Sequence, residues 1–553
     1  MIQNPILPGF NPDPSIVRVG DDYYIATSTF EWYPGVQIHH SRDLVNWRLL
    51  KRPLDRASQL DMRGAPDSCG VWAPCLTHAD GLFWLIYTDV KRYGRTSTGA
   101  AAGGASLRDF HNYLVTSPGI DGPWSDPVHL NSSGFDPSLF HDDDGRKYLL
   151  NQLWDHRPGS NRFAGIVAQE YSVAERRLVG PRRNIFAGTA HGLTEAPHLY
   201  KREGWYYLLT AEGGTGWNHG VTMARARELQ GPYELHPDAT ILSARHRPDA
   251  ALQRAGHADL VDTQDGQTWM VYLCGRPLRN RGTCTLGRET AIQPVVWGED
   301  GWLRTLDGQG TPQLQAAAPA LPEHRFAAAP VREDFDAPQL PIAFQWLRTP
   351  WPEELFSLAA RPGHLRLYGR ESLGSQFRQA LVARRQGAHC YSAATVVDFE
   401  PEHFQQQAGL VCYYGAAKFH YLYITHDETL GKHLRVMSSL PNHVQADAFT
   451  APVALPPGLP VGLRVEVDEE RLVFGYQVGG GDWQWLAQGF DASILSDEAS
   501  APGQPNFTGA FVGMACQDMA GSALHADFDW FEYRERAYCI DPRADSGNGG
   551  PRN

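Results

Sequence analysis

The segment Asp13-Pro-Ser-Ile-Val-Arg-Val-Gly-Asp-Asp-Tyr-Tyr-Ile25 recurs in varied form four more times along the chain. Each copy contains an aliphatic anchor, then a turn rich in Asp and Gly, then a strand rich in aromatic residues. The anchors are Ile16, Leu76, Leu139, Leu199 and Leu260, with successive spacings of 60, 63, 60 and 61 residues. Near-equal spacing of this kind indicates five like structural units rather than one irregular domain.

Each unit has the pattern of a β-hairpin followed by further strands, because Asp-Gly turns supply the positive φ angles that tight hairpins need. About sixty residues suit a four-stranded sheet, and such sheets repeated around an axis form a β-propeller, here with five blades. In a propeller the residues just before the anchors meet at one mouth of the central channel. These residues are Asp13, Trp72, Asp136, Glu195 and His257.

The repeat ends near residue 305, so the fold class is all-β with two domains. We predict a five-bladed propeller over residues 1–310 and an Ala- and Pro-rich linker over 311–332. Alternating strands predict a β-sandwich of the jelly-roll, concanavalin-like kind over 333–538. Residues 539–553 are rich in Gly, Pro and Arg and are predicted to be a frayed tail. A glycine-rich insertion at 93–110 would either cover the channel mouth or be inert.

Composition excludes several classes of function. The formal net charge is −13 and the 49 Lys and Arg residues form no block, which argues against a nucleic-acid partner. No apolar run is long enough to span a membrane. The first residues lack a secretory signal, which predicts a soluble, cytoplasmic protein, and a homo-oligomer stays open. The eight cysteines form no CxxC motif and are predicted to be free thiols.

Three of the converging residues carry carboxyl groups, namely Asp13, Asp136 and Glu195. Cleavage of a glycosidic bond uses one carboxylate as base or nucleophile and one carboxylic acid as proton donor. A third acid nearby would raise the pKa of the group that must stay protonated. A single Asp before Pro is ordinarily a turn or cap residue. Three acids at equivalent positions of the repeat favour the chemical interpretation.

Several longer segments resemble the two-domain β-xylosidases of glycoside hydrolase family 43. They are Asn11-Pro-Asp-Pro-Ser-Ile16, Tyr24-Ile-Ala-Thr-Ser-Thr-Phe-Glu-Trp32, Gly35-Val-Gln-Ile-His-His-Ser-Arg-Asp-Leu44, Val71-Trp-Ala-Pro74, Gly134-Phe-Asp-Pro-Ser-Leu-Phe-His141, Thr194-Glu-Ala-Pro-His-Leu199 and Leu286-Gly-Arg-Glu-Thr-Ala291. The resemblance extends from about residue 2 to about residue 536. It implies a five-bladed propeller with a C-terminal β-sandwich, and hydrolysis of xylose or arabinofuranose linkages with inversion.

The resemblance also implies a role for each residue that matches the family pattern. Asp13 would be the general base that activates water, Glu195 the general acid, and Asp136 the residue that raises the pKa of the acid and orients it. Substrate would contact Phe30, Trp72, Arg288, His257 and Phe507, with Phe507 reaching the pocket from the second domain. No cofactor is required, although His257 matches a histidine that in some relatives holds a divalent cation, such as calcium, through water.

The sequence therefore predicts an exo-acting enzyme that releases xylose from the non-reducing ends of β-1,4-xylo-oligosaccharides with inversion. An α-L-arabinofuranosidase, or an enzyme with both activities, is the alternative, because both sugars present similar hydroxyl groups to one pocket. A noncatalytic sugar-binding propeller is a third hypothesis from another class. It predicts no hydrolysis, and sugar binding that survives replacement of Asp13.

Overall fold

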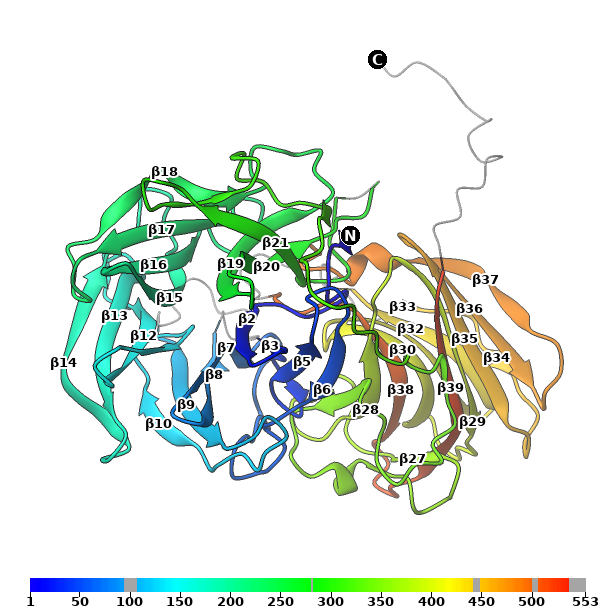
Figure 1. The fold of residues 1–553 in the computed structure, drawn as a ribbon. Coiled ribbons are helices and arrows are strands. Elements are labelled where there is room, and N and C mark those ends of the chain that lie inside the picture. The colour runs from blue at the N-terminus through cyan, green and yellow to red at the C-terminus, as the bar shows by residue number, and fades with distance from the viewer. Residues whose placement is uncertain (94–106, 280–281, 441–447, 500–505, 537–553) are drawn as a thin grey trace, which may run out of the picture.

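The computed structural model describes residues 1–93, 107–279, 282–440, 448–499 and 506–536. Figure 1 shows two adjoining all-β domains, with the propeller in blue to green and the sandwich in yellow to red. The predicted fold class, a five-bladed propeller followed by a concanavalin-like sandwich, is confirmed. The predicted tail at 539–553 and most of the insertion at 93–110 lie outside the described residues.

Each blade is a four-stranded antiparallel sheet in which the strands follow one another in chain order. Blade 1 contains β2 (Ser15–Val19), β3 (Asp22–Thr27), β5 (Gln37–Ser41) and β6 (Arg48–Lys51). Blade 2 contains β7 (Gly70–Ala79), β8 (Leu82–Arg92), β9 (Asp109–Ser117) and β10 (Val128–Asn131). Blade 3 contains β11 (Ser138–His141), β12 (Lys147–Trp154), β13 (Phe163–Ser172) and β14 (Arg177–Phe186). Blade 4 contains β15 (Glu195–Arg202), β16 (Trp205–Glu212), β17 (Gly220–Ala226) and β18 (Glu234–Ser243), and blade 5 contains β19 (Gln253–Asp262), β20 (Thr268–Gly275), β21 (Glu289–Trp297) and β22 (Leu303–Thr305).

The five anchor strands β2, β7, β11, β15 and β19 begin their sheets, as the repeat predicts. In Figure 1 the labelled strands β2, β7, β15 and β19 surround the centre of the propeller. The turns that follow them have the expected backbone. In blade 2, Asp80 and Gly81 both adopt positive φ, 55° and 72°, which matches the two-residue hairpin turn whose twist suits antiparallel strands.

The second domain consists of two large sheets that face each other. One contains β24 (Arg332–Glu333), β26 (Phe356–Ser357), β27 (Leu365–Tyr368), β29 (Cys390–Asp398), β35 (Val461–Asp468), β36 (Arg471–Val478), β37 (Gln484–Asp491) and β39 (His525–Glu535). The other contains β25 (Phe344–Leu347), β28 (Ala380–Arg385), β30 (Gln406–Gly415), β31 (Lys418–Asp427), β32 (Gly431–Ser439), β33 (Ala448–Phe449), β34 (Val453–Ala454), β38 (Phe511–Asp518) and one further strand, β4 (Trp32–Tyr33). Two short 3-10 helices, η1 (Pro352–Glu354) and η2 (Ala492–Ile494), lie in connections.

The two domains share a strand and a core. β4 belongs to the propeller part of the chain, yet it pairs with β25 at the edge of the sandwich sheet. The Trp32 ring is fully buried and stacks on Phe511 of β38, with ring centroids 3.7 Å apart. A small sheet of β1 (Ile2–Gln3) and β23 (Gln315–Ala316) places a strand inside the segment predicted as a linker. The sandwich is therefore packed firmly beside the channel mouth.

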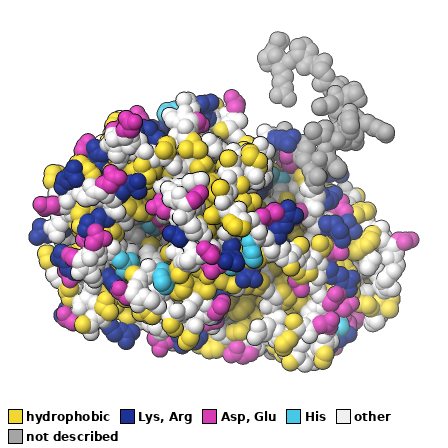
Figure 2. All heavy atoms as spheres, viewed as in Figure 1, with side chains coloured by type: hydrophobic (Ala, Val, Ile, Leu, Met, Phe, Trp, Pro, Cys, Tyr) yellow, Lys and Arg dark blue, Asp and Glu magenta, His cyan; other side chains and the backbone are white. Residues whose placement is uncertain are grey.

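The surface, the helices and the thiols have the following features. On the face shown in Figure 2, basic and acidic side chains are interspersed rather than gathered into one basic patch. Within the described ranges, the chain forms no helix long and apolar enough to cross a membrane. The seven described cysteines are all buried and unpaired, and Cys539 lies outside the described residues.

Candidate active site

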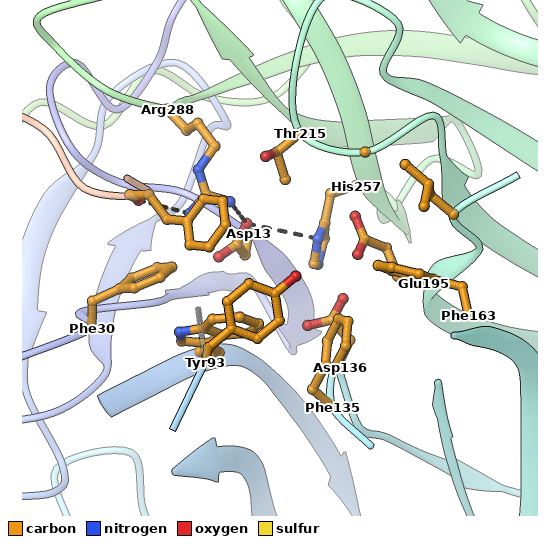
Figure 3. A pocket seen from close by; sticks show the side chains of 14 residues that line it. Asp13, Phe30, Tyr93, Phe135, Asp136, Phe163, Glu195, Thr215, His257 and Arg288 are labelled. Atoms are coloured by element: carbon orange, nitrogen blue, oxygen red, sulfur yellow. Dashed lines mark hydrogen bonds and ion pairs between the residues drawn. The ribbon is translucent and has the colours of Figure 1, made fainter. Parts of the chain in front are cut away.

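A cavity at the mouth of the channel collects the residues that the repeat predicts (Figure 3). Its volume of about 260 Å³ is slightly below the range of about 300–1,000 Å³ typical of pockets for drug-sized ligands. All five blades contribute to its lining, and Phe507 comes from the sandwich domain. The lining residues are Asp13, Phe30, Trp72, Tyr93, Phe135, Asp136, Phe163, Leu193, Glu195, Gly214, Thr215, His257, Arg288 and Phe507.

The backbone turns sharply where the anchor strands meet the cavity. Asp13, Asp136 and His257 adopt left-handed φ values of 57°, 52° and 45°, which non-glycine residues rarely adopt. In blade 4 the left-handed residue is Ala196, with φ 51°, and the register of β15 shifts between Glu195 and His198. Glu195 lies two residues before its proline, whereas Asp13 and Asp136 each lie directly before theirs. The irregular backbone of β15 accounts for this difference. Strained backbone at equivalent positions is typical of functional sites.

Asp13 is fixed as a hydrogen-bond acceptor on both of its carboxyl oxygens. Arg288 Nη1 donates to Asp13 Oδ1 at 2.6 Å, and Ser28 Oγ donates to Asp13 Oδ2 at 2.6 Å. His257 Nδ1 lies 3.7 Å from Asp13 Oδ1. A short charge-assisted hydrogen bond from a guanidinium favours the ionised carboxylate. Asp13 is thus oriented as an acceptor, as a base requires.

Arg288 connects the two domains at this site. Its side chain is only 2% exposed, and its Nη2 donates to the carbonyl oxygen of Phe507 at 2.8 Å. The guanidinium carbon also lies 5.2 Å from the centroid of the Phe30 ring, which adds a cation–π contact. One buried cation therefore holds both Asp13 and the segment of the sandwich domain that lines the pocket.

Asp136 and Glu195 form a second acidic group, whose carboxyls point into the cavity in Figure 3. Burial, and then the charge of Asp13, raise the pKa of Glu195 to about 8, against the opposing effect of Arg288. Burial, and then Glu195 and Asp13, raise the pKa of Asp136 well above its ordinary value. Both carboxyls are buried, Asp13 raises the pKa of each, and Glu195 also raises the pKa of Asp136, so the two are not both ionised near neutral pH. The pair therefore keeps a proton at the edge of the cavity.

The surroundings of the two carboxyls differ. Asp136 accepts a hydrogen bond from the backbone N–H of Ala196, which favours its ionised form. Glu195 Oε1 is buried and has no hydrogen-bond partner among the described residues. The hydrogen bond from Ala196 therefore opposes the raised pKa of Asp136, whereas Glu195 Oε1 has no such bond among the described residues.

His257 is buried beside Asp13, and burial, then His198 and Arg288, lower its pKa well below the ordinary value. A neutral imidazole could accept a hydrogen bond from water or a sugar hydroxyl. In the part of the chain that the structure describes, no group of three or more His, Cys, Asp or Glu side chains could hold a metal ion. Because calcium takes six to eight oxygen ligands, these residues do not fit a directly coordinated cation.

Aromatic rings line one side of the cavity. The Trp72 ring lies 5.8 Å from Phe30, 4.9 Å from Tyr93 and 5.6 Å from Phe507, measured between ring centroids. The C–H faces of a sugar pack well on such rings, so the wall suits a carbohydrate. The structure thus brings together every residue that the sequence singled out for this site.

Several lining residues were missed by the sequence analysis. Tyr93, Leu193 and Thr215 lie outside the strands and Phe163 is the first residue of β13, positions where the sixty-residue period gives no signal. Phe135 directly precedes Asp136 within the quoted segment Gly134–His141, so its position next to an acid of the repeat could have identified it. Ser28, which bonds Asp13, lies likewise within the quoted segment Tyr24–Trp32.

In chemical terms, the cavity pairs a carboxyl group that accepts hydrogen bonds from Arg288 and Ser28 with a carboxyl group whose pKa is raised, beside an aromatic wall. The first can remove a proton from water, and the second can donate a proton to a leaving oxygen. This combination suits hydrolysis of an acetal by acid and base catalysis.

Comparisons with known proteins agree with this geometry. Residues 2–303 match the family described as "Glycosyl hydrolases family 43", and residues 332–534 match the "Beta xylosidase C-terminal Concanavalin A-like domain". The chain is 52% identical to "Xylosidase/arabinosidase 43B" of Humicola insolens, over 96% of this chain and 97% of that protein. It is 50% identical to "Beta-xylosidase" of Bacillus subtilis (strain 168), over 97% and 100%. The crystal structure of xylan beta-1,4-xylosidase from Bacillus halodurans C-125 superposes with a TM-score of 0.93 at 52% identity, covering 97% of this chain and all of that one.

Proposed function

The chain belongs to glycoside hydrolase family 43, and we propose that it releases xylose from the non-reducing ends of β-1,4-xylo-oligosaccharides with inversion of configuration. The observation that carries the proposal is the pairing of two unlike carboxyl groups in one cavity. Asp13 accepts hydrogen bonds from Arg288 and Ser28, whereas the pKa of buried Glu195 is raised to about 8. An inverting glycosidase needs a base that accepts a proton and an acid that donates one.

In the proposed reaction Asp13 accepts a proton from a water molecule, whose oxygen attacks the anomeric carbon of the terminal xylose. Glu195 donates its proton to the glycosidic oxygen as the bond to the leaving sugar breaks. Asp136, next to Glu195, keeps the pKa of the acid high and fixes its orientation. Arg288 and Ser28 hold Asp13 so that one carboxyl oxygen faces the water.

Removal of single terminal sugars is supported by the shape of the pocket. The cavity is small, and Phe507 from the sandwich domain stands beside Trp72 and Phe30 at its wall. A polysaccharide chain passing through the site would need this side to be open.

A second activity, on α-L-arabinofuranosides, is favoured by one observation. The relative from Humicola insolens is named both xylosidase and arabinosidase at 52% identity. The same acid and base would serve either sugar, because the two differ in ring form and in the configuration at one carbon, whereas a glycosidic bond breaks in both. The third hypothesis, a noncatalytic sugar-binding propeller, is disfavoured by membership of a hydrolase family and by the acid–base pair.

A divalent cation is not part of the proposed chemistry, since the described residues offer no direct ligand set for one. His257 would at most contact such an ion through water. The proton transfers assigned above are carried out by Asp13 and Glu195 alone.

The test compares hydrolysis of p-nitrophenyl β-D-xylopyranoside and p-nitrophenyl α-L-arabinofuranoside by the wild type and by Asp13→Ala. We expect the wild type to prefer the xyloside and the variant to lose activity on both. A clear preference for the arabinofuranoside would instead support the second activity. Absence of hydrolysis with retained xylose binding in both proteins would support the noncatalytic hypothesis.

A further inference from the structure

Ser68 lies behind the aromatic wall of the pocket and does not itself line the cavity. It is 1% exposed and occupies the third position of a turn from Pro66 to Cys69, closed by a hydrogen bond from Cys69 N–H to the carbonyl oxygen of Pro66. Its φ of 61° is the left-handed value that a type II turn requires at this position. Glycine or asparagine adopts this backbone conformation with less strain than serine. The contacts of the Ser68 side chain therefore need an explanation.

All three polar groups of Ser68 are used, and two of them hold residues of the pocket. Its Oγ accepts a hydrogen bond from the backbone N–H of Phe507 at 3.0 Å. Its carbonyl oxygen accepts a hydrogen bond from the indole Nε1 of Trp72 at 3.0 Å. Phe507 comes from the sandwich and Trp72 from β7 of the propeller. One buried residue therefore fixes two rings that belong to different domains.

The third polar group of Ser68 connects it to a buried cluster at the domain interface. Its N–H donates to Glu31 Oε2 at 3.1 Å, and Glu31 is 1% exposed. The neighbouring Asp67 accepts from Arg348 Nη2 of the sandwich at 2.6 Å and from the backbone N–H of Ala416 at 2.7 Å. Arg348 N–H in turn donates to the carbonyl oxygen of Glu31 at 2.9 Å. The turn is thus held from both domains.

We propose that Ser68, supported by Glu31, is a positioning residue that holds Trp72 and Phe507 at the separation the terminal sugar requires. This inference rests on the proposed function, because it gives the wall a role in binding xylose. Without the Ser68 hydroxyl, the part-buried backbone N–H of Phe507 would lose its acceptor. That segment would then shift toward water or another acceptor, and the aromatic wall would loosen.

The effect should appear in sugar binding more than in the chemical step. Phe507 and Trp72 form the wall, whereas the proton transfers belong to Asp13 and Glu195. Ser68→Ala should therefore raise KM and the inhibition constant for xylose about fivefold or more, the low end of the effect of one orphaned donor. The turnover number should change much less. Alanine and serine are equally strained at this φ, so the backbone cost stays constant.

The experiment measures KM, kcat and the xylose inhibition constant for four proteins: the wild type, Ser68→Ala, Phe507→Ala and the double variant. If Ser68 acts through Phe507, the effect of Ser68→Ala shrinks markedly in the Phe507→Ala background. Ser438→Ala is the matched control, because it removes a buried hydroxyl bonded to His420 inside the sandwich. We expect the control to leave the inhibition constant unchanged.

If Ser68→Ala fails to fold, two variants of Glu31 test the same inference. Burial, and then Asp67, raise the pKa of Glu31 to about 8, so glutamine resembles its protonated form. Glu31→Ala should raise the inhibition constant for xylose, and Glu31→Gln should restore it. Unchanged xylose inhibition in folded Ser68→Ala, or in Glu31→Ala, overturns the inference, as does an equal rise with and without Phe507. Failure of the wild type to hydrolyse xylosides would instead refute the proposed function.

Discussion

The proposed general acid makes the activity sensitive to alkaline pH. Glu195 must be protonated to release the leaving sugar, so activity is present below its pKa and is lost as pH rises through it. With a pKa of about 8, about nine-tenths of the enzyme carries the proton at pH 7 and about one-tenth at pH 9. We therefore expect kcat/KM for xylobiose to fall about tenfold between these two pH values.

The assay is the pH profile of kcat/KM for xylobiose, with Glu195→Ala as the perturbation. An acid that donates a proton in the transition state contributes about 10²- to 10⁴-fold, and the variant should lose about that much on xylobiose. On p-nitrophenyl xyloside, whose leaving group departs as a stable anion, the loss should be far smaller. The alkaline fall in activity should disappear from the profile of the variant.

Three results would refute this reasoning. A fall in kcat/KM as the pH rises through about 5 would mean that the acid has the pKa of an ordinary exposed carboxyl. An alkaline fall near pH 8 that persists in Glu195→Ala would assign the titration to another group. Equal losses on both substrates would remove Glu195 from the role of proton donor.

Three further predictions address the neighbours of the acid and the base. Asp136→Asn should move the alkaline fall in kcat/KM to lower pH, because a carboxylate next to Glu195 disfavours the ionised form of the acid; an unmoved profile would contradict the pairing with Glu195. Arg288→Met removes the charge-assisted hydrogen bond to Asp13 and should lower kcat/KM about 10- to 100-fold while circular dichroism stays native; a loss below twofold would be inconsistent with the role of this arginine. Treatment with EDTA should leave kcat/KM unchanged, since the described residues form no direct cation site beside His257; inactivation that added Ca²⁺ reverses would show otherwise.

The repeat predicts the propeller because its period reflects a physical constraint. Each blade buries the same faces against its neighbours, so the anchor and the turn residues recur at nearly constant spacing. The anchors therefore locate all five inner strands, and the residues before them locate the acids. The offset of Glu195 is visible in the sequence, but its cause is a register shift in β15 that only the backbone reveals.

Contacts between distant segments could not be predicted in this way. The two-residue strand β4 pairs with β25 of the sandwich, and nothing in the local pattern of Trp32 and Tyr33 distinguishes it from a blade strand. Tyr93 follows β8 directly, and its ring lines the cavity and contacts Trp72. Periodicity describes which residues share a face of one sheet, and it contains no information on which segments of two domains will meet.

Ser68 is a second residue whose contacts cannot be predicted from the local sequence. Its surroundings in sequence, Pro66 to Cys69, indicate only a turn. Its contacts with Glu31, Trp72 and Phe507 depend on how the sandwich packs beside the first two blades. The residue could be identified only after both domains were placed together.

The central claim, that Asp13 is a base and Glu195 an acid in an inverting hydrolysis, is tested most directly by the anomer that is released first. Proton NMR spectra of wild-type enzyme acting on xylobiose would follow the two anomers of the xylose from the non-reducing end before they equilibrate. Attack of water opposite the leaving group on a β-linkage predicts that α-xylose is released first. Initial release of β-xylose would make Asp13 a nucleophile and would contradict the account.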